Sequence, residues 1–102
     1  MKHNKLKYQN LIVNYDARCA EIDGENIGLT HLEFSLLSYL MERKDFAISR
    51  QELLREIWEL PSAIETRATD DTIKRIRRKL VEHQSHVMIE TVRGYGFIIR
   101  TK

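Results

Sequence analysis

Lysine and arginine side chains gather in one short segment of this chain of 102 residues. The segment and its flanks contain Arg67, Lys74, Arg75, Arg77, Arg78, Lys79 and Arg93. A guanidinium group can bind guanine O6 and N7 in bidentate fashion, and either kind of cation can neutralise a phosphate. The chemistry that these residues favour is recognition of a polyanion.

The distribution of charge supports the same interpretation. The formal net charge is only +2, but residues 1–66 carry 8 Lys and Arg against 11 Asp and Glu, whereas residues 67–102 carry 9 against 4. A basic C-terminal third on a nearly neutral chain indicates a polyanionic partner without identifying it.

Other chemistries have little support. The sequence contains no Gly-rich phosphate loop and no Ser/His/Asp motif, so we expect no enzyme and no cofactor. His83 and His86 have no cysteine nearby, which disfavours a metal site. The single Cys19 is interpreted as a small packed residue. No apolar run exceeds three residues, which excludes a transmembrane helix, and we expect a cytoplasmic location.

The N-terminal part of the chain predicts a small antiparallel sheet. Short apolar or alternating segments within residues 6–29 read as four strands, with Asp23-Gly24 as a hairpin turn and the last strand running from Glu25 to Leu29. Residues 1–5 are polar and are expected to be frayed.

Two capping boxes then predict two helices. Thr30 with Glu33 and Ser49 with Glu52 have the S/T-x-x-E spacing in which each side chain bonds to the other residue's backbone N–H. Broad apolar faces follow both boxes, so the two helices should share a core. Residues 60–66 contain the only proline and read as a loop.

A third helix is expected over residues 69–83. Ile73, Ile76 and Leu80 form a narrow apolar stripe, the cations cover the opposite side, and Arg77 lies on the border between them. An ordinary solvated helix is the alternative, because Asp70–Lys74 and Asp71–Arg75 pairs at i,i+4 spacing would stabilise one.

The chain closes with a predicted hairpin of Val87–Val92 and Phe97–Arg100. Arg93-Gly94-Tyr95-Gly96 joins the two strands. An α-helix fits the DNA major groove, and an arginine at a hairpin tip can reach the neighbouring minor groove. The cationic helix and the hairpin together favour double-stranded DNA as the polyanion.

Several segments carry a family resemblance, which spans about residues 6–99. They are Leu29-Thr30 with Glu33-Phe34, Ile48-Ser49-Arg50 with Ile57-Trp58, Arg75-Ile76-Arg77-Arg78-Lys79-Leu80, and Thr91-Val92-Arg93-Gly94-Tyr95-Gly96-Phe97. Together they resemble the winged-helix effector domain of bacterial OmpR/PhoB-type response regulators. The resemblance implies an α+β winged helix-turn-helix with a four-stranded N-terminal antiparallel sheet, three helices and a C-terminal hairpin wing.

The resemblance also implies roles. The third helix would be the recognition helix in the major groove, with Arg75 as first choice for base contact, Arg67 on phosphate and Arg93 in the minor groove. The residues it implies at the DNA interface are Arg67, Thr72, Lys74, Arg75, Arg78, Lys79, Thr91, Arg93 and Tyr95. Loop 60–66 would contact RNA polymerase, and tandem dimers would bind direct repeats. The chain departs from the family pattern at Asp71, whose carboxylate could order Arg75 or Arg78, accept from cytosine N4, or weaken binding.

We therefore expect residues 1–102 to form one DNA-binding domain of a two-component-type transcription regulator, without a receiver domain. A winged helix used for protein–protein contact is the second hypothesis, which indifference of DNA binding to salt would favour. An enzyme is the third, and it would need a convergent polar cluster in a pocket.

Overall fold

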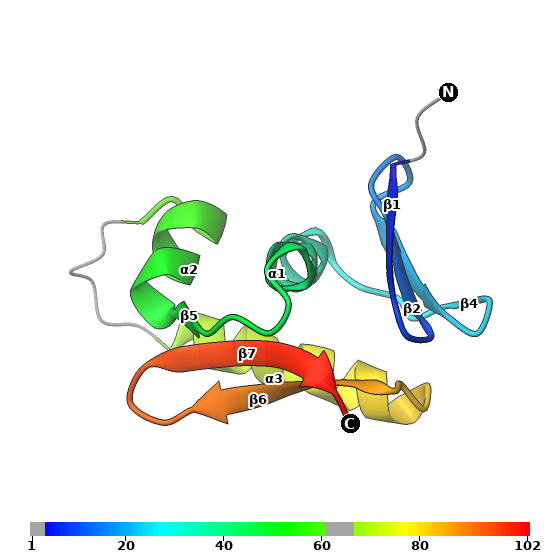
Figure 1. Ribbon diagram of the computed structural model, residues 1–102. Helices are drawn as coiled ribbons and strands as arrows, with labels where there is room; N and C mark the ends of the chain where they lie inside the picture. The colour runs from blue at the N-terminus through cyan, green and yellow to red at the C-terminus, as the bar shows by residue number, and fades with distance from the viewer. Residues whose placement is uncertain (1–3, 61–66) are drawn as a thin grey trace.

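The computed structural model describes residues 4–60 and 67–102, which form two antiparallel sheets and three helices (Figure 1). This is the α+β arrangement that the sequence predicts. None of the helices in these two ranges is long and apolar enough to cross a membrane.

The N-terminal sheet has the order β1-β2-β3-β4. Its strands are β1 (Lys5–Tyr8), β2 (Leu11–Asn14), β3 (Cys19–Ile22) and β4 (Glu25–Asn26). Alternation buries one face, and the pairs Leu11↔Ile22 and Val13↔Ala20 face the core. The prediction that the last strand reaches residue 29 is wrong, because Gly28 has φ +73° and its N–H donates to the Asn26 side chain.

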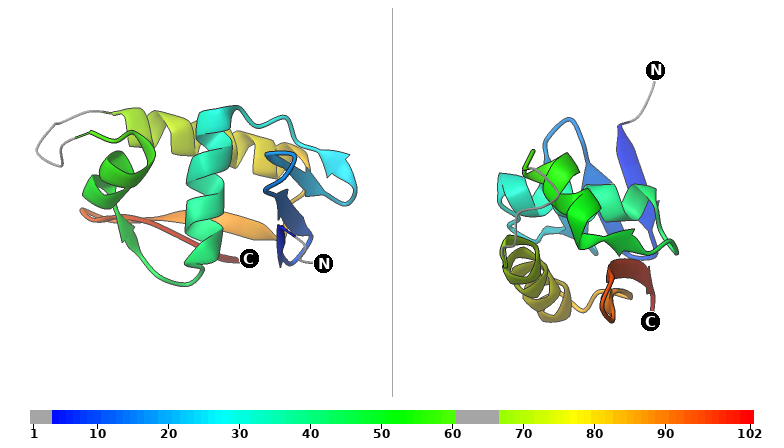
Figure 2. Two further views of the ribbon diagram at one scale, coloured as in Figure 1. Left: turned by 90° about the horizontal axis from the view of Figure 1, so that it is seen from above. Right: turned by 90° about the vertical axis from the view of Figure 1, so that its left-hand side faces the viewer.

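The first capping box is confirmed. Helix α1 (His31–Glu42) begins after Thr30, whose hydroxyl accepts from the Glu33 N–H at 3.2 Å, while the Glu33 carboxylate accepts from the Thr30 N–H at 3.0 Å. The helix buries a broad apolar face that includes Phe34, Leu37 and Leu40. It therefore occupies the centre of the molecule, between the N-terminal sheet and α2 (Figure 2).

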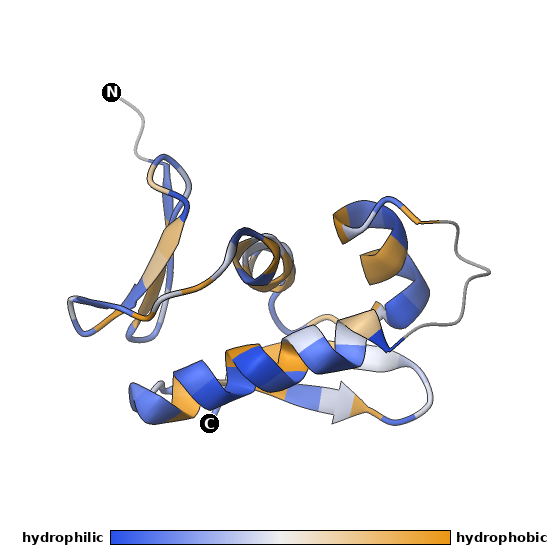
Figure 3. Cartoon of the chain, turned by 180° about the vertical axis from the view of Figure 1, so that it is seen from behind, coloured by the Kyte–Doolittle hydropathy of each residue, from blue (hydrophilic) through white to orange (hydrophobic). Residues whose placement is uncertain are grey.

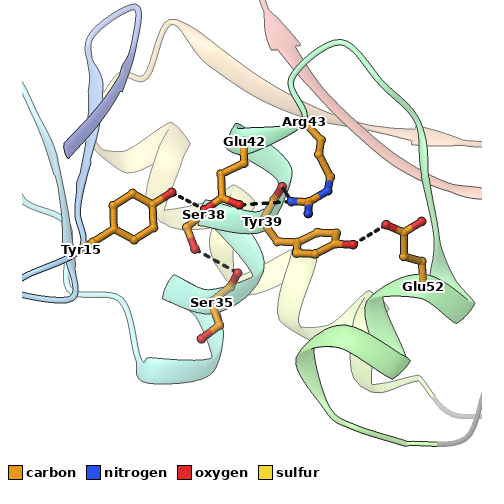
Figure 4. A network of polar contacts seen from close by, with 7 residues as sticks. All are labelled: Tyr15, Ser35, Ser38, Tyr39, Glu42, Arg43 and Glu52. Atoms are coloured by element: carbon orange, nitrogen blue, oxygen red, sulfur yellow. Dashed lines mark hydrogen bonds and ion pairs between the residues drawn. The ribbon is translucent and has the colours of Figure 1, made fainter. Parts of the chain in front are cut away.

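The second capping box is only half formed. Helix α2 (Arg50–Ile57) begins after Ser49, whose hydroxyl accepts from the Glu52 N–H at 3.0 Å. The Glu52 carboxylate, however, accepts from the hydroxyl of Tyr39 on α1 instead of reaching back to Ser49 (Figure 4). Burial and this bond raise the pKa of Tyr39 to about 12, so the phenol stays protonated and joins the two helices.

A second phenol holds α1 against the N-terminal sheet. The Tyr15 hydroxyl, just beyond β2, donates to Glu42 Oε2 at 2.5 Å, and Glu42 also pairs with Arg43 (Figure 4). Burial first, and then the Glu42 bond, raise the pKa of Tyr15. The central helix is thus fixed by tyrosine–carboxylate contacts on both sides.

The C-terminal sheet contains one strand more than the predicted hairpin. Its order is β5-β7-β6, from β5 (Ile48–Ser49), β7 (Gly96–Thr101) and β6 (Val87–Val92). β5 pairs with β7 through Ile48↔Phe97 and Ser49↔Gly96. Two residues are too few to show a strand periodicity, so only the folded chain reveals β5. Helix α3 (Ala68–Glu82) packs against α1, α2 and β6.

Candidate nucleic-acid interface

The outer face of α3 carries the exposed part of the basic segment. At about 100° per residue, positions 71, 74, 75, 78 and 82 fall on one side of the helix. Lys74, Arg75 and Arg78 are exposed there, together with Asp71, and Arg67 lies in line with them just before the helix. Figure 3 shows hydrophilic residues alternating with hydrophobic ones along the helix. Among the described residues, no carboxylate lies within ion-pair distance of Lys74, Arg75 or Arg78.

The turn between β6 and β7 presents a second basic group. Arg93 is exposed, Gly94 takes φ +72°, and the exposed fraction of Tyr95 is 49%. Thr91 is exposed on β6. The turn and the beginning of α3 lie at the same end of the molecule (Figures 1 and 3). Groups that are about twenty residues apart in sequence therefore border one region of the surface.

Two adjacent aspartates at the beginning of α3 have different surroundings. The i,i+4 spacing would allow Asp70 to pair with Lys74, but the structure does not have this pair. The Asp70 carboxylate instead accepts from Nε and Nη2 of Arg50 on α2, at 3.0 Å for the nearest pair of atoms. Asp71 is exposed on the basic face and has no ion pair within the described parts of the chain. Asp71 is thus the carboxylate left open to the solvent beside Lys74 and Arg75.

The expectation that Thr72 faces outward is wrong. Its exposed fraction is 2%, and it lies on the buried side of α3 with Thr69, Ile73 and Ile76. The buried stripe is wider than the three apolar positions indicate, because small threonine side chains pack on its edge. Thr72 is therefore withdrawn from the candidate interface.

Lys79 also departs from expectation. Its ammonium group turns away from the basic face and bonds to Glu33 Oε1 at 2.5 Å and to the Gly28 carbonyl at 2.8 Å. Burial acts to raise the pKa of Glu33, but the Lys79 bond, the Thr30 N–H and the charges of Lys79 and Arg75 lower it overall. Lys79 anchors α3 to the beginning of α1 and is withdrawn from the interface.

Arg77 lies on the border of the helix, as its position in the sequence indicates, and is half-buried. Its guanidinium donates to the Ile89 carbonyl at 2.8 Å and to the Thr91 hydroxyl at 2.9 Å, both on β6. Burial lowers its pKa, with Asp70 acting in the opposite direction. These contacts leave no signal in the sequence, because they depend on how α3 and β6 pack.

The histidines, the cysteine and the loop singled out in the sequence form no second functional site within the described residues. No cluster of three potential metal ligands occurs in the described parts of the chain, and His83 faces only Glu25, at 3.8 Å. Cys19 is a free, half-buried thiol. In the predicted loop 60–66, Leu60 is half-buried and its N–H donates to the Leu54 carbonyl at 3.0 Å, while residues 61–66 lie outside the described residues.

Comparison with known proteins gives a consistent result. Residues 24–99 match the family model described as transcriptional regulatory protein, C terminal. The chain is 36% identical over 95 residues to the response regulator ArlR of Staphylococcus aureus, and this alignment covers 93% of this chain and 43% of that protein. It is 31% identical over 97 residues to the response regulator ArlR of Staphylococcus saprophyticus, and this alignment covers 95% of this chain and 44% of that protein. It therefore spans less than half the length of these relatives.

Two solved structures have the same fold over nearly their whole length. One is the DNA-binding domain of CpxR from E. coli, with a TM-score of 0.84, 30% identity and coverage of 93% of this chain and 94% of that one. The other is the Klebsiella pneumoniae RstA DNA-binding domain in complex with the RstA box, with a TM-score of 0.84, 26% identity and coverage of 94% and 96%.

Proposed function

The chain belongs to the family of C-terminal domains of transcriptional regulatory proteins, of the OmpR/PhoB type, and on that premise we propose that it binds double-stranded DNA sequence-specifically to regulate transcription. Helix α3 enters the major groove, and the β6–β7 wing reaches the adjacent minor groove. Salt-dependent phosphate contacts supply most of the affinity, and α3 supplies the readout of bases.

One observation carries this proposal. Lys74, Arg75 and Arg78 on α3 and Arg93 on the wing are exposed, and the wing turn lies at the end of the molecule where α3 begins. Asp70 is paired with Arg50, while Asp71 and Glu82 are the acids exposed among these cations in the described residues. A surface helix without a polyanionic partner gains little from a face of unpaired cations, because like charges repel. Neighbouring duplex phosphates and guanine edges would offset that repulsion.

The family resemblance supports the following roles for the exposed residues. Arg75 binds guanine in bidentate fashion, Lys74 and Arg78 lie against phosphates on either side, and Arg67 holds a phosphate at the entrance of the helix. Arg93 enters the minor groove. Thr91 and Tyr95 lie beside the sugar–phosphate backbone.

We further propose the partners that the family suggests. Two copies bind direct-repeat half-sites as a tandem dimer, and loop 60–66 contacts RNA polymerase.

A mobility-shift titration tests the proposal, with a site selected from random duplex DNA and at two salt concentrations. We expect affinity to fall steeply between about 50 and 200 mM salt. Arg75→Ala should cost about 1–3 kcal/mol and relax the preference at one base position, because it removes a bidentate base contact. The matched control is Arg55→Ala, which removes an exposed arginine of α2 that pairs with Glu56.

Two results would contradict the proposal. Absence of duplex binding at low salt, or an affinity that does not change with salt, would favour a protein–protein role for this winged helix. Equal losses for Arg75→Ala and Arg55→Ala would remove α3 from the interface while leaving DNA binding itself intact.

A further inference from the structure

The hairpin is linked to α3 by two half-buried arginines, Arg50 of α2 and Arg77 of α3. We propose that Arg50 and Arg77 clamp the ring of Phe97, and that this clamp sets the position of Arg93 relative to the exposed face of α3. The inference rests on the proposed function and deepens it. It names positioning residues that touch no DNA but determine whether helix and wing reach two grooves at once.

Arg50 forms the arm of the clamp at the beginning of α3. Its guanidinium binds both carboxylate oxygens of Asp70, and its carbon Cζ lies 4.7 Å from the centre of the Phe97 ring. Its backbone N–H donates to the Tyr95 carbonyl in the wing turn at 3.1 Å. One residue of α2 therefore contacts the recognition helix, the base of the wing and its turn.

Arg77 forms the second arm, two helical turns further along α3. Its guanidinium donates to Ile89 and Thr91 of β6, and its Cζ lies 5.7 Å from the centre of the same ring. β6 is an edge strand of its sheet, so the Ile89 carbonyl has no partner strand on that side. Arg77 supplies the missing donor and joins the strand to the helix.

Phe97 is the element that both arms share. Its exposed fraction is 1%, and it sits in β7 between Ile48 of β5 and Thr91 of β6. A cation within about 6 Å of an aromatic face is attracted to it, more strongly when water is excluded. The ring therefore binds the two guanidinium groups at the place where wing, α2 and α3 meet.

Rigidity is the physical benefit. A projecting two-stranded hairpin is marginally stable alone, and a mobile wing would lose conformational freedom when Arg93 entered a groove. A wing already fixed to α3 avoids most of that loss. The contribution of Arg93 to DNA affinity should then depend on the clamp, although Arg50 and Arg77 themselves touch no DNA.

A double-mutant design measures this dependence. In each background, the DNA affinity of the protein with Arg93 is divided by that of the same protein with Arg93→Ala. The backgrounds are the wild type, the clamp variants Arg50→Lys, Asp70→Asn and Arg77→Lys, and the matched control Arg55→Lys. We expect a ratio of about ten in the wild type and the control, and less than about three in the clamp variants. Partial unfolding lowers both members of each pair equally, so a merely structural role would leave the ratio unchanged.

Amide order parameters of residues 93–95 in the free protein give a readout that needs no DNA. We expect lower order in Arg50→Lys and Arg77→Lys than in Arg55→Lys. Should Arg50→Lys fail to fold, Asp70→Asn tests the same arm. Unchanged ratios in all three backgrounds, or unchanged turn order, would overturn the clamp. If the wild type bound no duplex, the proposed function would fail, and the order parameters would still decide whether the arginines fix the wing.

Discussion

Neighbouring side chains of α3 have different roles because each position turns the helix by about 100°. Asp70 binds Arg50 at the border, whereas Asp71 points outward among the cations. Arg78 is exposed, but Arg77 and Lys79 on either side of it are taken up by β6 and by Glu33. The number of cations in the sequence of α3 is therefore larger than the number that the helix exposes to a partner.

Acid should weaken the contact between α3 and α1. Glu33 has a pKa lowered below its ordinary value of 4.5 in the folded protein, so its carboxylate contributes stability that is fully present above about pH 4.5. That contribution is lost as the pH falls through the lowered folded-state pKa. Urea unfolding of Glu33→Gln and the wild type at several pH values should show a stability difference at pH 6 that shrinks toward pH 3.

The matched control for that measurement is Glu21→Gln, a half-buried residue of β3 with no ion pair in the described residues. A Glu33→Gln difference that stays constant from pH 6 to pH 3 would contradict the assignment of the stabilising charge to Glu33.

At the scale of elements, the contact between β5 and β7 holds the wing at its base. A Cβ added at Gly96 would lie 1.8 Å from the Ile48 carbonyl oxygen and 2.8 Å from Ser49 Cα, both backbone atoms. These two strands approach so closely that only glycine fits. β5 also leads directly into α2, so one short strand positions both Arg50 and the wing.

Gly96→Ala should therefore separate β5 from β7 and lower the free energy of unfolding by about 1–3 kcal/mol, the usual cost of overpacking. Gly24→Ala is the comparison, because Gly24 has open space around it and only its φ of +85° opposes a side chain. Denaturant melts of the two variants decide the matter. A loss at Gly96 no larger than at Gly24 would show that the strands can separate without cost.

At the scale of the whole molecule, the longest dimension is 39 Å. One turn of B-DNA spans about 34–36 Å, so each chain can cover about one turn. Two copies bound head to tail would therefore place their α3 helices on the same side of the duplex when their half-sites are about 10 bp apart.

Changing the spacing tests this arrangement. Inserting about 5 bp between direct-repeat half-sites should abolish cooperative binding, because the second copy would face the opposite side of the duplex. Inserting about 10 bp restores the rotational phase but separates the copies. A titration of duplexes with the three spacings checks this, and equal cooperativity at all spacings would contradict a tandem dimer.

Much of the fold could be predicted from local patterns. The Thr30 capping box, the turn at Asp23-Gly24, the long helix near residue 69 and the final hairpin all show in short windows, because caps, turns and periodicity act between neighbours in sequence. The prediction of a complete second capping box is wrong because the Glu52 carboxylate accepts from Tyr39 on α1, thirteen residues away in the sequence.

Residue type and local spacing are enough to predict most of the helices and strands and a basic helix followed by a basic turn, and the family resemblance adds the type of fold. Tertiary structure alone decided which cations stay exposed. Lys79 meets Glu33, Arg50 meets Asp70 and Phe97, and Arg77 meets Ile89 only when the helices and strands pack. Contacts between residues that are distant in the sequence leave no signal in the periodicity of either segment.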